Sequence, residues 1–150
     1  MEKSIIEFKN RLIELNACYE ARTWAEGKTA KEAWEQCERG DWLLWWAKKE
    51  GQEIRSLTLA KARCAKLVIH LMKDKRSIDA VNVAERFGLG QANKKELNTA
   101  AYAAAYAAAY AAYAAAYAAY AAADAANAVR KATLLKCAEI VRENIKPTFI

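Results

Sequence analysis

The chain has 150 residues, enough for one domain with a hydrophobic core, and its formal net charge of +6 favours an anionic partner. One histidine and four scattered cysteines without CxxC spacing disfavour a zinc site, so neither a metal nor another cofactor is predicted. The cysteines are expected to be reduced core thiols of a cytoplasmic protein, because the charged N-terminal segment does not have the pattern of a secretory signal.

Two helices are predicted at the N-terminus. Residues 4–15 repeat apolar side chains at helical spacing, and Asn16 is expected to end this helix. A short second helix around Trp24 should stop at Gly27, because glycine readily adopts the left-handed conformation found after helices.

A third helix is predicted from a capping box at Thr29 and Glu32. In this motif the threonine hydroxyl accepts a hydrogen bond from the glutamate amide, and the glutamate side chain accepts one from the threonine amide. The helix is expected to end at Gly40, and Asp41 is expected to cap the turn that follows. That turn carries three tryptophans at positions i, i+3 and i+4, typical of core packing but also suited to a binding surface: Trp42, Trp45 and Trp46.

A basic face is predicted on a helix over residues 56–73. The apolar residues line one side, and no acidic residue occurs between Glu53 and Asp74. Five basic side chains fall within about 80° of one another on the opposite side, so they form an unpaired face that is either solvated or a partner site: Arg55, Arg63, Lys66, His70 and Lys73.

The most unusual stretch runs from residue 100 to residue 128. It holds 21 alanines, six tyrosines, Asp124 and Asn127, and alanine has the highest helix propensity of all residues. Residues 93–127 are therefore predicted to form a long central helix, capped at its start by Asn93 and Glu96. A bend or break is expected near Asp124 to Asn127, before a terminal amphipathic helix at 128–146.

The fold class predicted from these elements is all-α. We expect a single domain, a compact bundle in which the short helices of residues 1–92 surround the long Ala/Tyr-rich helix. A transmembrane interpretation of residues 97–123 is disfavoured, because its tyrosines would lie through the bilayer core instead of at its edges.

The tyrosines form one stripe along the predicted helix, within an arc of about 80°. In one interpretation the rings fill the grooves between neighbouring helices. In the other they join the tryptophans in a stacking pocket for a planar ligand, with polar contacts from Asp124, Asn127, Arg130 or Lys131. The stripe consists of Tyr102, Tyr106, Tyr110, Tyr113, Tyr117 and Tyr120.

Catalytic motifs are absent from the sequence. There is no phosphate-binding glycine loop, no Gly-x-Ser-x-Gly and no HExxH. Gly88-x-Gly90 follows a short helix, predicted to start at Ser77 and end at Gly88, instead of a strand. A lone Asp124 is more often a cap or a tyrosine partner than a catalytic group. The sequence therefore predicts a protein that is not an enzyme.

Several segments resemble one family in order along the chain. They are the run beginning ACYEARTWAEG at residue 17, the run AWEQCERGDWLLWW at residue 33, the AYAAAYAAAYAAYAAAYAAY helix and the closing LKCAEIVRENI. Together these motifs resemble the fifth family of polymorphic-toxin immunity proteins, which has bacterial and phage members. The resemblance implies an all-helical, non-enzymatic protein that protects a cell or a virus by binding an effector. It implies no particular binding residues.

Two functions remain open, beside a scaffold or self-assembly module that only the helical bundle supports. In the first, the basic helix and exposed tryptophans bind an acidic surface of a toxin or defence protein and neutralise it. In the alternative, a phage-type sponge sequesters an anionic nucleotide signal, with Arg or Lys on the phosphates and Tyr or Trp on the base. A nucleic-acid mimic should be acidic, so that mechanism is disfavoured, and neither nucleic acid nor a membrane is a predicted partner. The candidate binding residues are Trp42, Trp45, Trp46, Arg63, Lys66, His70, Tyr106, Tyr110, Tyr113, Tyr117, Asp124, Asn127 and Arg130.

Overall fold

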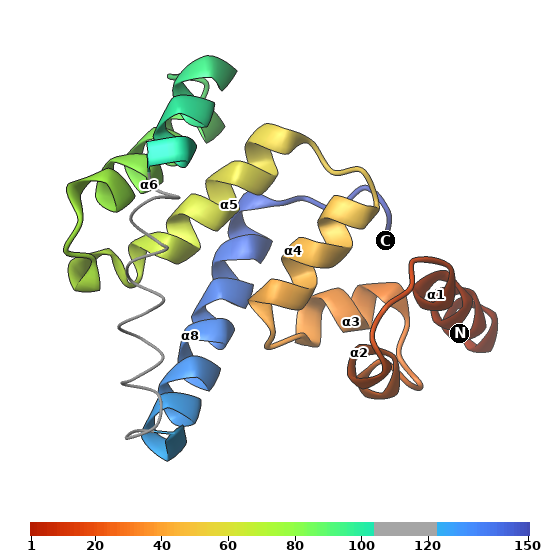
Figure 1. Cartoon of the computed structure of the whole chain (residues 1–150). Helices are drawn as coiled ribbons and strands as arrows, with labels where there is room; N and C mark the ends of the chain where they lie inside the picture. The colour runs from red at the N-terminus through yellow and green to blue at the C-terminus, as the bar shows by residue number, and fades with distance from the viewer. Residues whose placement is uncertain (104–122) are drawn as a thin grey trace.

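The computed structural model describes residues 1–103 and 123–150, with side chains described up to residue 103 and from residue 130 onward. All of the secondary structure in these ranges is helical, which confirms the predicted all-α class (Figure 1). None of the described helices is both long and apolar enough to cross a membrane.

The N-terminal helices follow the predicted pattern closely. Helix α1 (Glu2–Glu14) buries Phe8 and Leu12, and Asn16 ends it with a φ of 57°. Helix α2 (Tyr19–Trp24) is followed by Gly27, whose φ of 75° is the left-handed conformation expected there.

Helix α3 (Ala30–Gln36) begins at the predicted capping box. The Glu32 amide donates to Thr29 Oγ1 at 3.3 Å, and the Thr29 amide donates to Glu32 Oε2 at 2.8 Å. The helix ends at Gln36, so the prediction that it continues to Gly40 is wrong. Gly40 is instead the first residue of α4 (Gly40–Lys49).

The prediction that Asp41 caps the helix after Gly40 is also wrong. Arg39 occupies the N-cap position of α4, and no side chain caps the helix there. Both carboxylate oxygens of Asp41 instead accept hydrogen bonds from the Arg39 guanidinium, at 2.8 and 2.7 Å. Asp41 is the second residue of α4, inside its first turn, so its side chain is not at the N-cap position.

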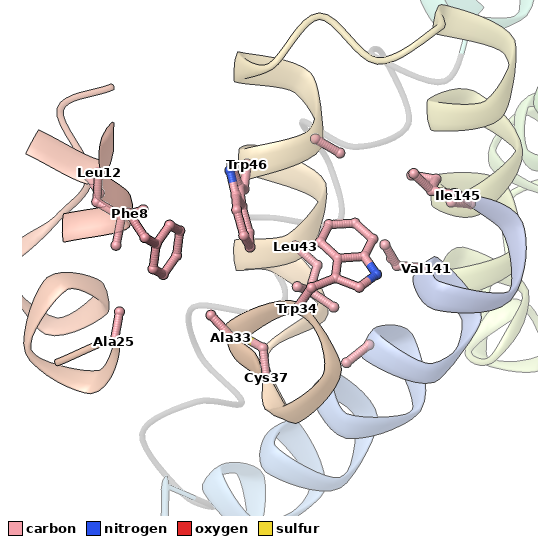
Figure 2. Packing of buried hydrophobic residues seen from close by; sticks show 14 of the residues in the cluster. Phe8, Leu12, Ala25, Ala33, Trp34, Cys37, Leu43, Trp46, Val141 and Ile145 are labelled. Atoms are coloured by element: carbon pink, nitrogen blue, oxygen red, sulfur yellow. The ribbon is translucent and has the colours of Figure 1, made fainter. Parts of the chain in front are cut away.

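The core lies where α4 meets α8 (Ala123–Asn144), which also packs against α5 (Figure 1). Leu43, Val141 and Ile145 are its largest fully buried side chains, and Figure 2 shows them converging from α4 and from the C-terminal part of the chain. Gly40 allows the close contact: a Cβ added to it would lie 2.5 Å from Cys137 Cβ and 2.6 Å from the Ala138 nitrogen.

The helix predicted over residues 56–73 is shorter than expected. Helix α5 (Ile54–Lys66) ends before Val68, and a short 3₁₀ helix η1 (Ile69–Leu71) follows. Val68 and Ile69 are β-branched, which lowers the helix propensity of this stretch.

Helix α6 (Lys75–Gly88) packs against α5. Residues 94–103 are helical, and their start carries the predicted box: Asn93 Oδ1 accepts from the Glu96 amide, and Glu96 Oε2 accepts from the Asn93 amide, each at 2.8 Å. Tyr102, the first residue of the tyrosine stripe, has an exposed fraction of 75%.

Helix α8 is continuous over Asp124 and Asn127, so no break lies between these two residues, while the stretch just before Ala123 lies outside the described residues. Alanines flank them on both sides, and the helix propensity of that context outweighs the capping tendency of Asp and Asn. The greater part of the predicted central Ala/Tyr helix, residues 104–122, lies outside the described residues.

Candidate functional site

The three predicted tryptophans of α4 have different surroundings. Trp46 is buried, with its ring centroid 5.0 Å from that of Phe8, 5.7 Å from that of Trp34 and 5.1 Å from that of Phe149. Its indole N–H donates to Glu50 Oε1 at 3.2 Å. Trp46 is therefore a core residue with a satisfied polar group.

Trp42 and Trp45 are half-buried and line a cavity of about 360 Å³ together with Trp46. We call this space the tryptophan cavity. Figure 2 shows two of its sides, with Phe8, Leu12 and Ala25 facing Trp46, Ala33 and Cys37. The lining is mostly apolar and comes from α1, α2, α3, α4 and the intervening turns. The residues that complete it are Asn16, Cys18, Ala21, Trp24, Asp41 and Leu43.

A second space, of about 440 Å³, adjoins the tryptophan cavity. The two share Trp24, Cys37 and Trp42, and the rings of Trp24 and Trp42 meet edge to face at 6.1 Å and 64°. We call the second space the cationic groove, because three of its lining residues are basic. Its full lining is Trp24, Lys28, Gln36, Cys37, Glu38, Arg39, Trp42, Lys131 and Leu134.

Cations lie over the faces of the indoles that border these spaces. Lys28 Nζ is 5.1 Å from the ring centroid of Trp24, and Arg39 Cζ is 4.6 Å from that of Trp42. Lys49 Nζ is 5.9 Å from the ring centroid of Trp45. Each pair is within the distance at which a cation is attracted by the ring quadrupole.

The bidentate pair of Arg39 and Asp41 fixes the charge at this edge of the site. Hydrogen bonding to Asp41 raises the pKa of Arg39, and the same hydrogen bonds lower the pKa of Asp41. Both groups therefore stay ionised at neutral pH, and the guanidinium is held over Trp42.

The four cysteines are free thiols. The prediction that all of them are core residues is wrong. Cys37 is buried, Cys64 and Cys137 are half-buried, and Cys18 is exposed. Burial raises the pKa of the Cys37 thiol, which donates to Arg39 O at 3.5 Å, so the wall it gives to both spaces is uncharged. Within the described ranges, no group of three or more His, Cys, Asp or Glu side chains could hold a metal ion.

The predicted basic face does not exist as an unpaired face. Glu85 of α6 bonds to Lys66 and lies 3.6 Å from Arg63, and Arg63 also donates to the Asn144 side chain. The neutralising carboxylate comes from another helix, so the sequence of α5 alone does not reveal it. His70 is exposed in η1 and does not belong to the helix face on which it was placed.

Of the remaining predicted residues, Lys131 lines the cationic groove, and the others are not placed in the site. Arg130 is exposed on α8 and does not line the tryptophan cavity or the cationic groove. Tyr106, Tyr110, Tyr113 and Tyr117 lie outside the described residues, as do the side chains of Asp124 and Asn127. A pocket between the tyrosines and the tryptophans thus stays a prediction.

Sequence reasoning missed Trp24, Lys28 and Arg39 as members of the site. A local signal exists: Lys28 follows Trp24 by four residues, and Arg39 precedes Trp42 by three, which are spacings at which a cation can reach a ring. Comparison of the chain with protein-family models, with curated proteins and with solved structures finds no significant match. The site itself consists of an aromatic cavity beside a groove with an excess of basic side chains.

Proposed function

We propose that this protein neutralises an effector, either a toxin or a defence protein, by direct binding in conflicts involving bacteria or phages, without catalysing a reaction. The observation that carries the proposal is the tryptophan cavity, in which Trp42 and Trp45 are half-buried and border an apolar space. Aromatic residues that are partly accessible at the edge of a pocket are frequent anchors of protein interfaces.

Charge favours an effector with an acidic surface. Lys28, Arg39 and Lys49 lie over the indoles at this side of the molecule, and the whole chain has a net charge of +6. An apolar side chain of the effector would enter the cavity while carboxylates around it meet these cations. The proposed surface is therefore on α3 and α4, in place of the α5 face whose cations are paired with Glu85.

The test is a rescue assay in bacterial strains that each carry one phage-defence system or one toxin. We expect expression of the protein to restore phage plating or cell growth in at least one strain. Trp45→Ala removes an aromatic wall of the cavity without touching the cationic groove, and it should reduce the rescue at least tenfold.

Tyr19→Ala is the matched control, because Tyr19 is an aromatic residue of α2 with an exposed fraction of 75% and lines neither space. It should retain full rescue. Circular dichroism checks that both variants fold. If folded Trp45→Ala protects as well as the unaltered protein, the tryptophan cavity is not the effector-binding surface.

A second candidate function, a sponge for an anionic nucleotide signal, is favoured by the cationic groove. Three basic residues line that groove against one carboxylate, Glu38, and two tryptophans lie beside them. The test is mass spectrometry of small molecules released by heat from protein incubated with a lysate containing nucleotide signals. A nucleotide in near-stoichiometric amount supports the sponge. A protein that stays folded and releases none, from a lysate verified to contain the signal, argues against it.

A further inference from the structure

We propose that the cationic groove binds a nucleoside phosphate, with the phosphate between Lys28 and Lys131 and the base against the Trp24 and Trp42 pair. This inference rests on the second candidate function and assigns it a site. The groove brings together residues that are far apart in sequence: Lys28 follows α2, Arg39 precedes α4, and Lys131 belongs to α8.

Neither lysine forms a hydrogen bond or a close ion pair with a residue that the structure describes. The Lys28 ammonium lies over the face of Trp24 and also interacts electrostatically with the Glu32 carboxylate, which already accepts hydrogen bonds from Thr29, while Lys131 lines the groove. Since an ammonium is a strong donor, two of them beside one groove create a place for a dianion. A phosphate ester has this charge near neutral pH.

Arg39 adds an oriented donor. Its Nε and Nη2 are used by Asp41, which leaves Nη1 without a hydrogen bond to a described residue. The guanidinium is planar and already fixed over Trp42, so binding through Nη1 requires little further ordering of this side chain.

The remaining wall suits a planar, weakly polar group. Trp24 and Trp42 offer aromatic surface, Leu134 is apolar, and Cys37 carries a protonated thiol. Aromatic side chains stack on any nucleobase because every base has a π face. Gln36 and Glu38 supply a donor and acceptors at the same groove for the polar edge of the base.

Size and charge limit the ligand to a small nucleotide. The groove of about 440 Å³ lies in the range of known small-molecule sites, about 300–1,000 Å³. Its three basic residues are opposed by Glu38 on the lining and by Asp41 beside Arg39. The small excess of positive charge fits a single phosphate and not the long polyanionic track of a nucleic acid.

The experiment is isothermal titration calorimetry of the full chain with AMP, GMP, CMP and UMP. The four corresponding nucleosides test the base and sugar without the phosphate, and ribose 5-phosphate and inorganic phosphate test the phosphate without the base. We expect at least one nucleotide to bind at least tenfold more tightly than ribose 5-phosphate or its own nucleoside. The double variant Lys28→Glu with Lys131→Glu should weaken binding of that nucleotide at least tenfold.

The matched control is Lys61→Glu with Lys94→Glu, which changes the net charge equally at two exposed lysines outside the groove. It should bind within twofold of the unaltered protein. The proposal is overturned if none of the four nucleotides binds below about 1 mM, if the groove variant binds like its control, or if inorganic phosphate alone binds as tightly as the best nucleotide.

The failure of this site can be distinguished from failure of the proposed functions. Trp45→Ala leaves the groove lining intact, so it should retain nucleotide binding even though it reduces effector rescue. Tight nucleotide binding without any signal released from a lysate would leave the site standing and reject the sponge. A signal released equally by the Lys28→Glu, Lys131→Glu variant would reject the site and leave the sponge standing.

Discussion

At the scale of single residues, Glu50 connects α1 to α4. Its carboxylate accepts from Arg11 Nε at 3.1 Å, from Arg11 Nη2 at 2.9 Å and from the indole of Trp46 at 3.2 Å. Its side chain has an exposed fraction of only 10%. Hydrogen bonding from Arg11 lowers the pKa of Glu50 below its ordinary value of 4.5.

This carboxylate predicts a pH-dependent stability. Because the folded-state pKa lies below the unfolded one, Glu50 stabilises the fold above the unfolded pKa, and the stabilisation is lost as the pH falls through the folded pKa. Glu50→Gln should therefore lower the Tm at about pH 7 and make the Tm fall less steeply from there to about pH 3. Thermal denaturation followed by circular dichroism measures both. Parallel Tm profiles for Glu50→Gln and the unaltered protein would contradict the prediction.

Residue-scale prediction from the sequence succeeded where both partners are near neighbours and failed where one is distant. The Thr29 and Glu32 box needs only local geometry. The pairing of Lys66 with Glu85 needs the contact between α5 and α6, which the helix period does not specify. Asp41 shows a local failure, because α4 begins at Gly40, one residue before it, so that Asp41 lies within the first turn and pairs with Arg39.

At the scale of elements, most helix starts and ends were predictable from caps, glycines and apolar spacing. The exceptions are instructive. The end of α3 at Gln36 and the end of α5 at Lys66 carry no glycine, so nothing in the sequence marked them as strongly as Asn16 or Gly27 mark theirs.

The capping box supplies a test of α3. Thr29→Ala removes the acceptor for the Glu32 amide and should destabilise the protein by about 1 kcal/mol. Thr29→Ser keeps the hydroxyl and should restore most of that loss. Urea denaturation of the two variants measures the difference. Equal stabilities for Thr29→Ala and Thr29→Ser would mean that the cap does not stabilise α3.

At the scale of the whole molecule, the junction of α4 and α8 contains deeply buried apolar side chains. Leu43 has an exposed fraction of 1%, whereas Leu135 of α8 is 37% exposed. Leu43→Ala should cost about 2–5 kcal/mol of unfolding free energy, because it removes buried apolar contacts and leaves a cavity. Leu135→Ala makes the same chemical change at the surface and should cost less than about 1 kcal/mol. Chemical denaturation tests the pair, and similar losses would contradict the burial given for Leu43.

The candidate site was only partly predictable at this scale. The sequence identified Trp42, Trp45 and Trp46 as a group, because they share one short helix. It did not identify the groove formed by Lys28, Arg39 and Lys131, because tertiary packing alone joins these three segments. The prediction that Arg63 and Lys66 of α5 are unpaired failed for the same reason, since their carboxylate partner Glu85 lies on α6.

The contact of Gly40 with Ala138 also sets the rotational phase of α8. Lys131 lies seven residues before Ala138, two helical turns or about 10 Å along the axis, and therefore on nearly the same side of the helix. One residue inserted between them would turn Lys131 by about 100° relative to that contact and take its ammonium away from Lys28. Length changes within residues 132–137 should therefore be tolerated far less well than single substitutions at exposed positions of the same segment.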